Sequence, residues 1–191
     1  MNFCKKCGEK VAQEIPENDT RLRYVCATCT TIHYENPNIV AGVLPLIMDT
    51  DGVEKILLCR RAIEPRYGLW TLPAGFMENG ESVEEAAARE SDEEANLKLG
   101  KLRLYTVMSL PHISQVYMIF IGQAVNDFSP GIESLETRLF DESEIPWDEI
   151  AFPVMTKTLQ CYFTDRKTSV ENNHEDFPVH NLVHQAPSRR S

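Results

Sequence analysis

Three glutamates close together in the middle of the chain are the residues best suited to do chemistry. Glu90, Glu93 and Glu94 lie in a stretch rich in alanine and glutamate, which favours a helix. At about 100° per residue, their side chains fall within an arc of roughly 100° on that helix. Small and apolar residues project to the same side, which is the side a helix normally packs against a sheet: Val83, Ala86, Ala87 and Leu97.

Carboxylates crowded on such a face repel one another, and partial burial raises the free energy of their ionised forms. A hard divalent cation relieves both effects, and a set of oxygen ligands favours Mg²⁺ or Mn²⁺ over softer metals. The pattern therefore predicts a metal site on this helix. The alternative, which the spacing of the glutamates leaves open, is the solvated acidic face of a surface helix.

The helix that must position these acids has a start that can be read from the sequence. Ser82 can cap it, and Glu85 three residues later completes an S-x-x-E capping box. Before the helix, residues 72–75 end an apolar run, and Asn79-Gly80 is a turn signal. A flexible loop is therefore expected to lead into the acidic helix.

The spacing of charged residues in this region resembles the signature of the Nudix family, G-x5-E-x7-R-E-U-x-E-E-x-G-U, where U is aliphatic. The matching residues are Gly75, Glu81, Arg89, Glu90, Glu93, Glu94 and Leu97. Two positions depart from the signature, because Ser91 replaces an aliphatic residue and Asn96 replaces the second glycine. Asparagine tolerates a left-handed conformation, so the helix can still end at Asn96. Ser91 can loosen the packing of the helix but is expected to touch no ligand.

The resemblance implies a fold and a reaction. It predicts an α/β fold, the Nudix αβα sandwich around a mixed sheet, over roughly residues 39–165. The reaction is hydrolysis of a nucleoside diphosphate linked to another group. Glu90 and Glu94 would be the principal ligands of Mg²⁺ or Mn²⁺, with Glu93 as a further ligand or the catalytic base. The backbone carbonyl of Gly75 would join them as a metal ligand.

The resemblance also implies an ion pair and an acid from outside the signature. Glu81 and Arg89 would pair and fix the loop against the helix. The segment that begins at Glu136 resembles the start of a strand where relatives carry another metal-binding glutamate. Glu136 is therefore the first candidate for this ligand or for the base, and Glu133 is the second. The alternative is that both residues only solvate an acidic loop.

Four cysteines near the N-terminus indicate a second metal site. Their spacing, C-x2-C-x18-C-x2-C, is typical of a zinc ribbon, and the residues are Cys4, Cys7, Cys26 and Cys29. Gly8 suits the tight turn after the first pair. Four thiolates leave no position for water, so the zinc would be structural. Disulfides are the alternative, but no secretory signal is apparent, and a reducing cytoplasm favours zinc.

The composition favours one domain with a small module attached. The chain has 191 residues, of which 42% are hydrophobic, and a formal net charge of −10. This charge disfavours loose attraction to nucleic acid or to membrane surfaces. No apolar run of about 18 residues is present, so no membrane span is expected. We predict a ribbon in residues 1–34, a Nudix domain in 35–165 and a mostly disordered polar tail in 166–191.

Apolar runs and turn signals locate the remaining elements. The hinge between the modules is predicted at Asn36-Pro37-Asn38, and a final helix is predicted from Pro153 to about Asp165. The predicted strands are residues 39–48, 53–59, 101–110, 115–125 and 137–140. Three arginines near the end of the second strand are candidates for phosphate contacts, although surface salt bridges are their commoner role: Arg60, Arg61 and Arg66.

The segment after the acidic helix bears on the substrate. A zinc ribbon joined to a Nudix domain occurs in NADH pyrophosphatases and in the FAD and ADP-ribose pyrophosphatase branch. The former carry S-Q-P-W-P-F-P-x-S after the signature, whereas residues 109–115 here read S-L-P-H-I-S-Q, without the tryptophan and phenylalanine. Pro111 lies close to where ADP-ribose-hydrolysing relatives place a proline. The resemblance therefore favours hydrolysis of ADP-ribose, FAD or a related dinucleotide to release AMP, with NADH as the alternative.

An alternative function, of a different class, is that of a non-catalytic regulator that senses a ligand or binds nucleic acid through the ribbon. The intact glutamates and the negative net charge disfavour it. The expected partner is thus a small dinucleotide or nucleotide sugar, and neither nucleic acid nor a membrane is expected. Enzymes of this kind are often homodimers, and the ribbon could lie at that interface.

Overall fold

The predicted hinge lies where the chain divides into two units. A computed structural model describes residues 1–172 and 177–185 of the protein. Its two units are Met1–Pro37 and Asn38–Ser191, so the division falls within Asn36-Pro37-Asn38. Among the described residues, no helix is both long enough and apolar enough to cross a membrane.

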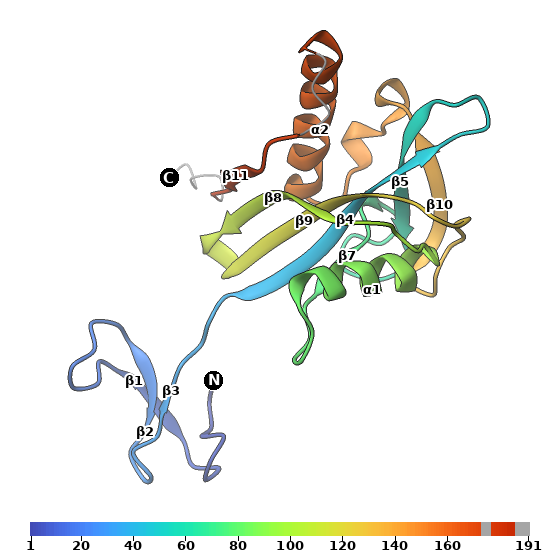
Figure 1. The fold of residues 1–191 in the computed structure, drawn as a ribbon. Coiled ribbons are helices and arrows are strands. Elements are labelled where there is room, and N and C mark those ends of the chain that lie inside the picture. Colours follow the sequence, from blue (N-terminus) through green and yellow to red (C-terminus); the bar gives the residue numbers. More distant parts are fainter. Residues whose placement is uncertain (173–176, 186–191) are drawn as a thin grey trace. The chain divides into compact units, whose positions relative to one another are not determined.

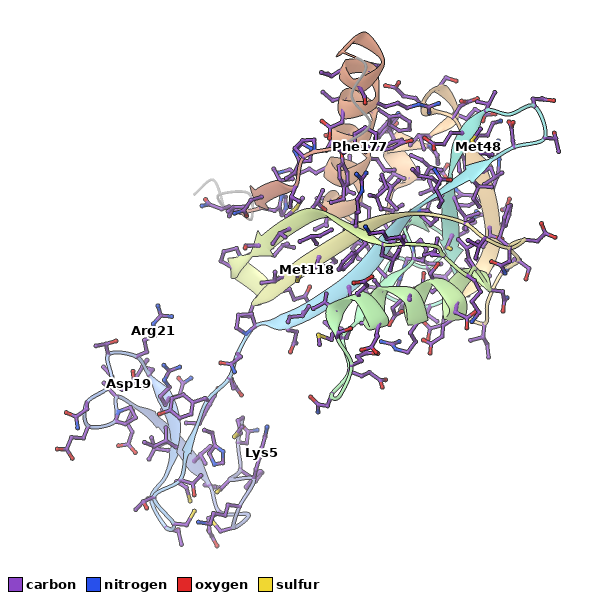
Figure 2. All side chains as sticks on the ribbon, in the orientation of Figure 1. Lys5, Asp19, Arg21, Met48, Met118 and Phe177 are labelled. Atoms are coloured by element: carbon purple, nitrogen blue, oxygen red, sulfur yellow. The ribbon has the colours of Figure 1, made fainter. Side chains whose placement is uncertain are left out.

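The first unit is built on a small antiparallel sheet. Its strands, in spatial order, are β1 (Val11–Glu14), β2 (Arg23–Cys26) and β3 (Ile32–His33). The carboxylate of Asp19 holds the connection between β1 and β2. It accepts hydrogen bonds from the backbone N–H groups of Thr20 and Arg21, and Arg23 Nε donates to it at 2.9 Å. Asp19 and Arg21 are labelled in Figure 2. The hairpin brings the two cysteine pairs to the same end of the unit.

A mixed sheet is the centre of the second unit (Figure 1). Its spatial order is β10-β5-β4-β9-β8-β11, with β6 paired to β5 and β7 paired to β4. The β4–β9 and β8–β11 pairs are parallel, and the others are antiparallel. The strands are β4 (Asn38–Met48), β5 (Glu54–Arg61), β6 (Trp70–Thr71), β7 (Ala74–Phe76), β8 (Arg103–Leu110), β9 (Gln115–Gln123), β10 (Ser134–Phe140) and β11 (His180–Val183).

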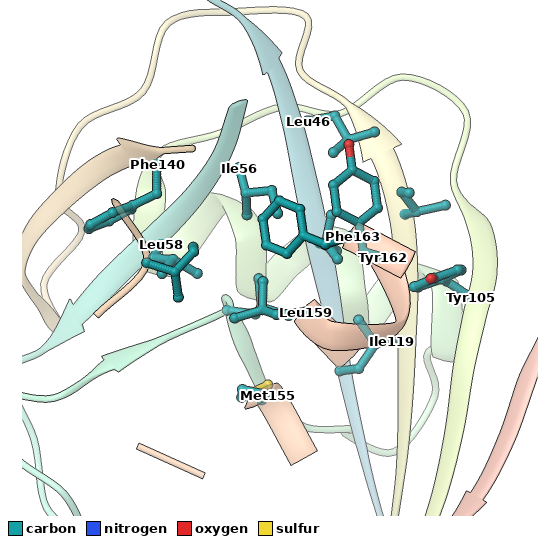
Figure 3. Close-up of a cluster of buried hydrophobic side chains, with 14 of the residues drawn as sticks. Leu46, Ile56, Leu58, Tyr105, Ile119, Phe140, Met155, Leu159, Tyr162 and Phe163 are labelled. Carbon is teal, nitrogen blue, oxygen red and sulfur yellow. The ribbon is translucent and has the colours of Figure 1, made fainter. Parts of the chain in front are cut away.

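Two long helices cover opposite faces of this sheet, which confirms the predicted αβα sandwich (Figure 1). They are α1 (Val83–Ala95) and α2 (Pro153–Asn172), and short 3₁₀ helices span Pro111–Ile113, Glu142–Glu144 and Trp147–Glu149. Alternate residues of β4 face the two helices, because successive strand side chains point to opposite faces. Ala41 and Val43 pack with α1, whereas Leu44 and Leu46 belong to the larger core beneath α2 (Figure 3).

Helix α1 begins and ends as predicted. Ser82 Oγ accepts a hydrogen bond from the backbone N–H of Glu85 at 3.2 Å, and Glu85 Oε2 accepts one from Ser82 N at 2.7 Å. At the other end, Asn96 takes the left-handed conformation, with φ 49° and ψ 32°. Ser91 is fully buried against the sheet, and its hydroxyl has no hydrogen-bond partner among the described residues.

The prediction for the C-terminal region needs correction. Helix α2 does not end near Asp165 but continues to Asn172, and His180–Val183 forms strand β11 beside β8 instead of a disordered tail. The aromatic ring of Phe177 packs between Tyr105 and Tyr162, close to α2 (Figure 2). This anchor orders the segment, while residues 173–176 and 186–191 of the predicted tail lie outside the described part of the chain.

Candidate metal and catalytic site

Helix α1 turns two of the three candidate glutamates toward the sheet. Glu90 and Glu94 lie one helical turn apart, and the side chain of Glu90 is 12% exposed. Glu94 is 5% exposed. Glu93, at the edge of the same arc, has a side chain that is 56% exposed. The structure therefore brings two of the predicted carboxylates inward and places the third at the rim.

The two inward carboxylates are held at an electrostatic cost. Burial, together with the negative charges of Glu90 and Glu133, raises the pKa of Glu94 to about 8, and the positive charge of Arg61 acts in the opposite direction. Burial also raises the pKa of Glu90, against the lowering effect of its hydrogen bond with Arg89. This is the condition that a bound divalent cation would relieve.

Arg89 connects the loop before α1 to the acids of the helix. Its Nε and Nη2 donate to the two carboxylate oxygens of Glu81 at 3.1 and 2.9 Å, and Nη2 also donates to Phe76 O at 3.1 Å. Nη1 donates to Glu90 Oε1 at 2.7 Å and to Glu93 Oε2 at 3.0 Å. The pair of Glu81 and Arg89 thus has the geometry that the resemblance implies, and the side-chain hydrogen bond with Arg89 lowers the pKa of Glu81 to about 2.

The backbone at Gly75 lies directly against the carboxylate of Glu90. Strand β7, which contains Gly75, pairs with β4 in front of α1, and a Cβ atom at this position would overlap Glu90. The absence of a side chain at Gly75 leaves room for this approach. Two carboxylates and the backbone of one glycine provide hard oxygen donors, which fit Mg²⁺ or Mn²⁺.

The acids of α1 do not form a closed cluster of three carboxylates. Within the described residues, the one group of three or more Cys, His, Asp or Glu side chains whose ligand atoms lie within 4.8 Å of one another is the cysteine quartet. A cation at Glu90 and Glu94 would therefore need oxygens from the backbone, from water or from a substrate to complete its coordination.

The two candidates from outside the signature have different surroundings. Glu136 lies 3.8 Å from Arg60 Nη1, so its charge is paired on the sheet surface. Glu133 is exposed, and its charge contributes to the raised pKa of both Glu90 and Glu94. The register of β10 against β5 shifts between Ser134 and Glu136, so an irregularity of the strand lies between the two glutamates. No local pattern in the sequence predicts this irregularity, so the resemblance alone favours Glu136 over Glu133.

Among the three candidate arginines, Arg61 has a charge that acts on a carboxylate of α1, that of Glu94. It is 9% exposed, its Nε donates to Pro65 O at 2.9 Å, and its guanidinium lies 5.3 Å from the centre of the Phe152 ring. Its charge lowers the pKa of Glu94. Arg60 instead donates to Gly68 O. Arg61 is thus a fixed positive charge beside the buried carboxylates.

The four cysteines of the first unit converge as the spacing predicts. Cys4 Sγ lies 3.6 Å from Cys29 Sγ, and Cys7 Sγ lies 3.5 Å from Cys26 Sγ. Tetrahedral Zn²⁺ with Zn–S bonds of about 2.3 Å separates its sulfur ligands by about 3.8 Å, so the quartet fits zinc. Gly8, at a φ of 78°, makes the turn after the first pair.

Neighbouring groups shift the pKa values of the quartet's thiols in opposite directions. The backbone hydrogen bond of Glu9 acts to lower the pKa of Cys7, but the side-chain hydrogen bonds with Cys29 and Cys26 raise it to about 12. The side-chain hydrogen bond with Thr31 lowers the pKa of Cys29 to about 6. His33 Nε2 lies 3.2 Å from Cys4 Sγ, where the ring can donate to the sulfur. His33 therefore has the place of a supporting residue rather than of a fifth ligand.

Comparison with known proteins matches both units of the chain. Residues 37–158 match the family described as "NUDIX domain", and residues 2–35 match the zinc-ribbon family described as "Nudix N-terminal". The crystal structure of a NUDIX hydrolase from Nitrosomonas europaea is 49% identical, with a TM-score of 0.85, and the match covers 97% of this chain and 100% of that one.

Curated relatives are more distant and longer. The NAD-capped RNA hydrolase NudC of Vibrio atlanticus (strain LGP32) is 29% identical over 76% of this chain and 51% of its own length. The human mitochondrial NAD(P)H pyrophosphatase NUDT13 is 30% identical over 81% of this chain and 41% of its own length. The chain thus spans about half the length, or less, of these relatives. By the matched domain, its signature and its fold, the chain belongs to the Nudix hydrolase family.

Proposed function

We propose that this protein is a metal-dependent pyrophosphohydrolase that cleaves the diphosphate bridge of ADP-ribose, FAD or a related dinucleotide and releases AMP. The observation that carries the proposal is the pair of inward carboxylates, half-buried Glu90 and buried Glu94, one turn apart on α1, with Glu90 against the backbone at Gly75. When bound there, Mg²⁺ or Mn²⁺ would neutralise diphosphate oxygens and make phosphorus a better target for water.

The residues around the pair have distinct roles in this proposal. Glu90 and Glu94 hold the cation together with the Gly75 carbonyl. Arg89 fixes the orientation of Glu90 and ties it to the loop through Glu81, so loss of Arg89 misplaces a ligand instead of deleting one. Glu93, at the exposed rim, is a further ligand.

Arg61 is the group we assign to the substrate phosphates. Its guanidinium is held by Pro65 and Phe152, so little conformational freedom is lost when it binds an anion. Its positive charge already stabilises Glu94 in the ionised form. A diphosphate beside the acids would face one fixed cationic side chain in addition to the metal.

We assign the proton acceptor for the attacking water to the carboxylate of Glu133, ahead of Glu136. Glu133 influences both buried acids, while Glu136 is paired with Arg60. A positioned base is worth about 10²–10⁴ in rate. Glu133→Gln should therefore lower kcat by that order, and Glu136→Gln should leave kcat nearly unchanged.

NADH is the second candidate substrate, and the names of the curated relatives favour it. The segment after α1 favours it less. At the end of β8 this chain has a 3₁₀ turn that contains Pro111, and exposed His112 and Ile113 stand where a signature of tryptophan and phenylalanine is expected. A base could not stack there on the same side chains.

The experiment is a panel of ADP-ribose, FAD, NADH, NAD-capped RNA and diadenosine polyphosphates with Mg²⁺ or Mn²⁺, scored by released AMP. We expect ADP-ribose or FAD to give the highest kcat/KM and Glu94→Gln to abolish turnover. Glu84→Gln, an exposed acid on the same helix, is the matched control. Faster turnover of NADH or capped RNA would move the substrate to the second candidate. Tight, salt-sensitive RNA binding without release of AMP would support the regulator instead.

A further inference from the structure

A loop beside the site is attached to the end of α1 by a residue that departs from the Nudix signature. Asn96 stands where the signature has glycine, and its left-handed backbone ends the helix. Glycine would adopt this conformation more easily. The backbone therefore gives no reason for asparagine at this position, and its side chain must be considered.

The side-chain amide of Asn96 reaches across to residues 129–130. Its Nδ2 lies 3.2 Å from Ser129 O, 3.1 Å from Ser129 Oγ and 3.1 Å from Pro130 O. The two N–H bonds of one amide are thus shared among three acceptors of a loop more than thirty residues away in the sequence. Glycine could make none of these contacts.

The backbone of the same loop caps the end of the helix. Ser129 N donates to Ala95 O at 3.0 Å, and Gly131 N donates to Glu94 O at 2.9 Å. Carbonyl groups in the last turn of a helix have no N–H donor within the helix, so the loop supplies the donors. At Gly131, a Cβ atom would overlap Glu93 O. The loop therefore lies flush against the turn that carries the candidate ligands.

A second asparagine, which follows strand β9, adds hydrogen bonds between the loop and the end of α1. Asn126 Nδ2 donates to Asn96 O at 3.0 Å, and Asn126 Oδ1 accepts from Lys98 N at 2.6 Å. Both ends of the loop segment 126–131 are thus bonded to the chain around Asn96.

This attachment determines where Glu133 lies. Ser134 N donates to Gly131 O at 3.1 Å, and Ala62 N donates to Glu133 O at 2.8 Å. The backbone of Glu133 is therefore held between the end of α1 and the end of β5. If the loop moved away from α1, one of the two supports of Glu133 would be lost.

We propose that Asn96 is a positioning residue, whose side-chain amide fixes residues 129–131 on α1 and so keeps Glu133 beside Glu90 and Glu94. The inference rests on the proposed function, in which Glu133 accepts the proton from water. Asn96 itself contacts neither substrate nor metal in this account. It acts only through the loop.

The test is a double-mutant cycle with Asn96→Gly and Glu133→Gln. Glycine keeps the left-handed helix end and removes only the amide, and we expect kcat to fall about tenfold with KM changed little, as for supporting residues of metal sites. In the Glu133→Gln background, the same change should alter kcat by less than about twofold, because there is no base left to position. Asp92→Ala, in the same helix turn and with a half-buried side chain that pairs with Lys98, is the control and should keep wild-type kcat.

A second readout follows the loop itself. Hydrogen exchange at the backbone amides of Ser129 and Gly131 should speed up in Asn96→Gly and stay unchanged in Asp92→Ala, while α1 remains helical by circular dichroism. Equal losses of kcat in both backgrounds would overturn the inference, since the amide would then act on the helix in general. Wild-type kcat or unchanged exchange in Asn96→Gly would overturn it as well. If Glu133→Gln kept full activity, the inference would fail while release of AMP still upheld the proposed function.

Discussion

Glu94 combines burial with negative neighbours, and this gives the metal-free protein a definite response to pH. The pKa of Glu94 is raised from 4.5 to about 8, mainly by burial, so the folded protein binds its proton more tightly than the unfolded chain does. Stability should therefore fall as pH rises from about 4.5 to about 8 and should level off above that range.

The measurement is the melting temperature of zinc-loaded protein in Mg²⁺-free buffer across this range of pH. Added Mg²⁺ should restore stability at the alkaline end, because the ionised form then gains a partner. Glu94→Gln should flatten the profile and remove the response to Mg²⁺. A slope that is the same in wild type and Glu94→Gln would assign the pH dependence to other groups.

Two serines of α1 should respond to alanine in opposite directions. The hydroxyl of Ser91 is buried without a partner among the described residues, so Ser91→Ala should raise the free energy of unfolding by about 1 kcal/mol. Ser82 caps the helix, and Ser82→Ala should lower it by about 1 kcal/mol. Urea unfolding measures both, and a loss of stability in Ser91→Ala would contradict this account.

Within the helix, the sequence was a good guide because the information is local. The capping box, the left-handed Asn96 and the inward direction of Glu90 and Glu94 follow from residues within a few turns of one another. The preference for Glu133 over Glu136 as the base does not follow from local residues. It depends on a register shift in β10 and on the salt bridge of Glu136 to Arg60, and both involve the distant strand β5.

At the scale of elements, the segment after α2 forms a strand, β11, that hydrophobic periodicity does not predict. Phe177 and His180 stand alone in a polar sequence, and their partners, Tyr105 and Asp165, come from β8 and α2. The carboxylate of Asp165 accepts hydrogen bonds from Tyr105 Oη at 2.8 Å and pairs with His180 Nε2 at 2.7 Å. Contacts of these single side chains hold strand β11 in place, although no repeating pattern in the sequence predicts that strand.

This attachment predicts a loss of stability without a loss of chemistry. Phe177→Ala removes an aromatic ring packed on Tyr105 and Tyr162 and should lower the free energy of unfolding by about 2 kcal/mol, while the kcat for AMP release stays unchanged. Val179→Ala, at a side chain that is 55% exposed, is the matched control and should change little. Equal stability of the two variants in urea would show that the segment is not anchored by Phe177.

At the scale of the whole molecule, the hinge separates a small unit with a cysteine quartet from a larger unit with its own core. The first unit has 37 residues, and its buried side chains are those of Cys4 and Cys26, so we expect its fold to depend on a metal bound by the quartet. The second has hydrophobic clusters on both faces of its sheet. The two units should therefore respond differently to loss of zinc.

Cys26→Ser tests this division. The wild-type protein should contain one zinc ion per chain by elemental analysis, and the variant should lose it because three thiolates bind zinc less tightly than four. The main thermal transition, from residues 38–191, should shift little. Wild-type zinc content in the variant, or loss of the main transition, would contradict the separation of the two units.

The central claim is that Glu90 and Glu94 hold a divalent cation, and binding of Mn²⁺ followed by electron paramagnetic resonance tests it most directly. Mn²⁺ prefers oxygen ligands, so the ribbon thiolates compete little for it. We predict saturable binding by the wild type, a loss of affinity of more than about tenfold in Glu94→Gln, and wild-type binding in Glu84→Gln. Undiminished binding of Mn²⁺ by Glu94→Gln would contradict the account.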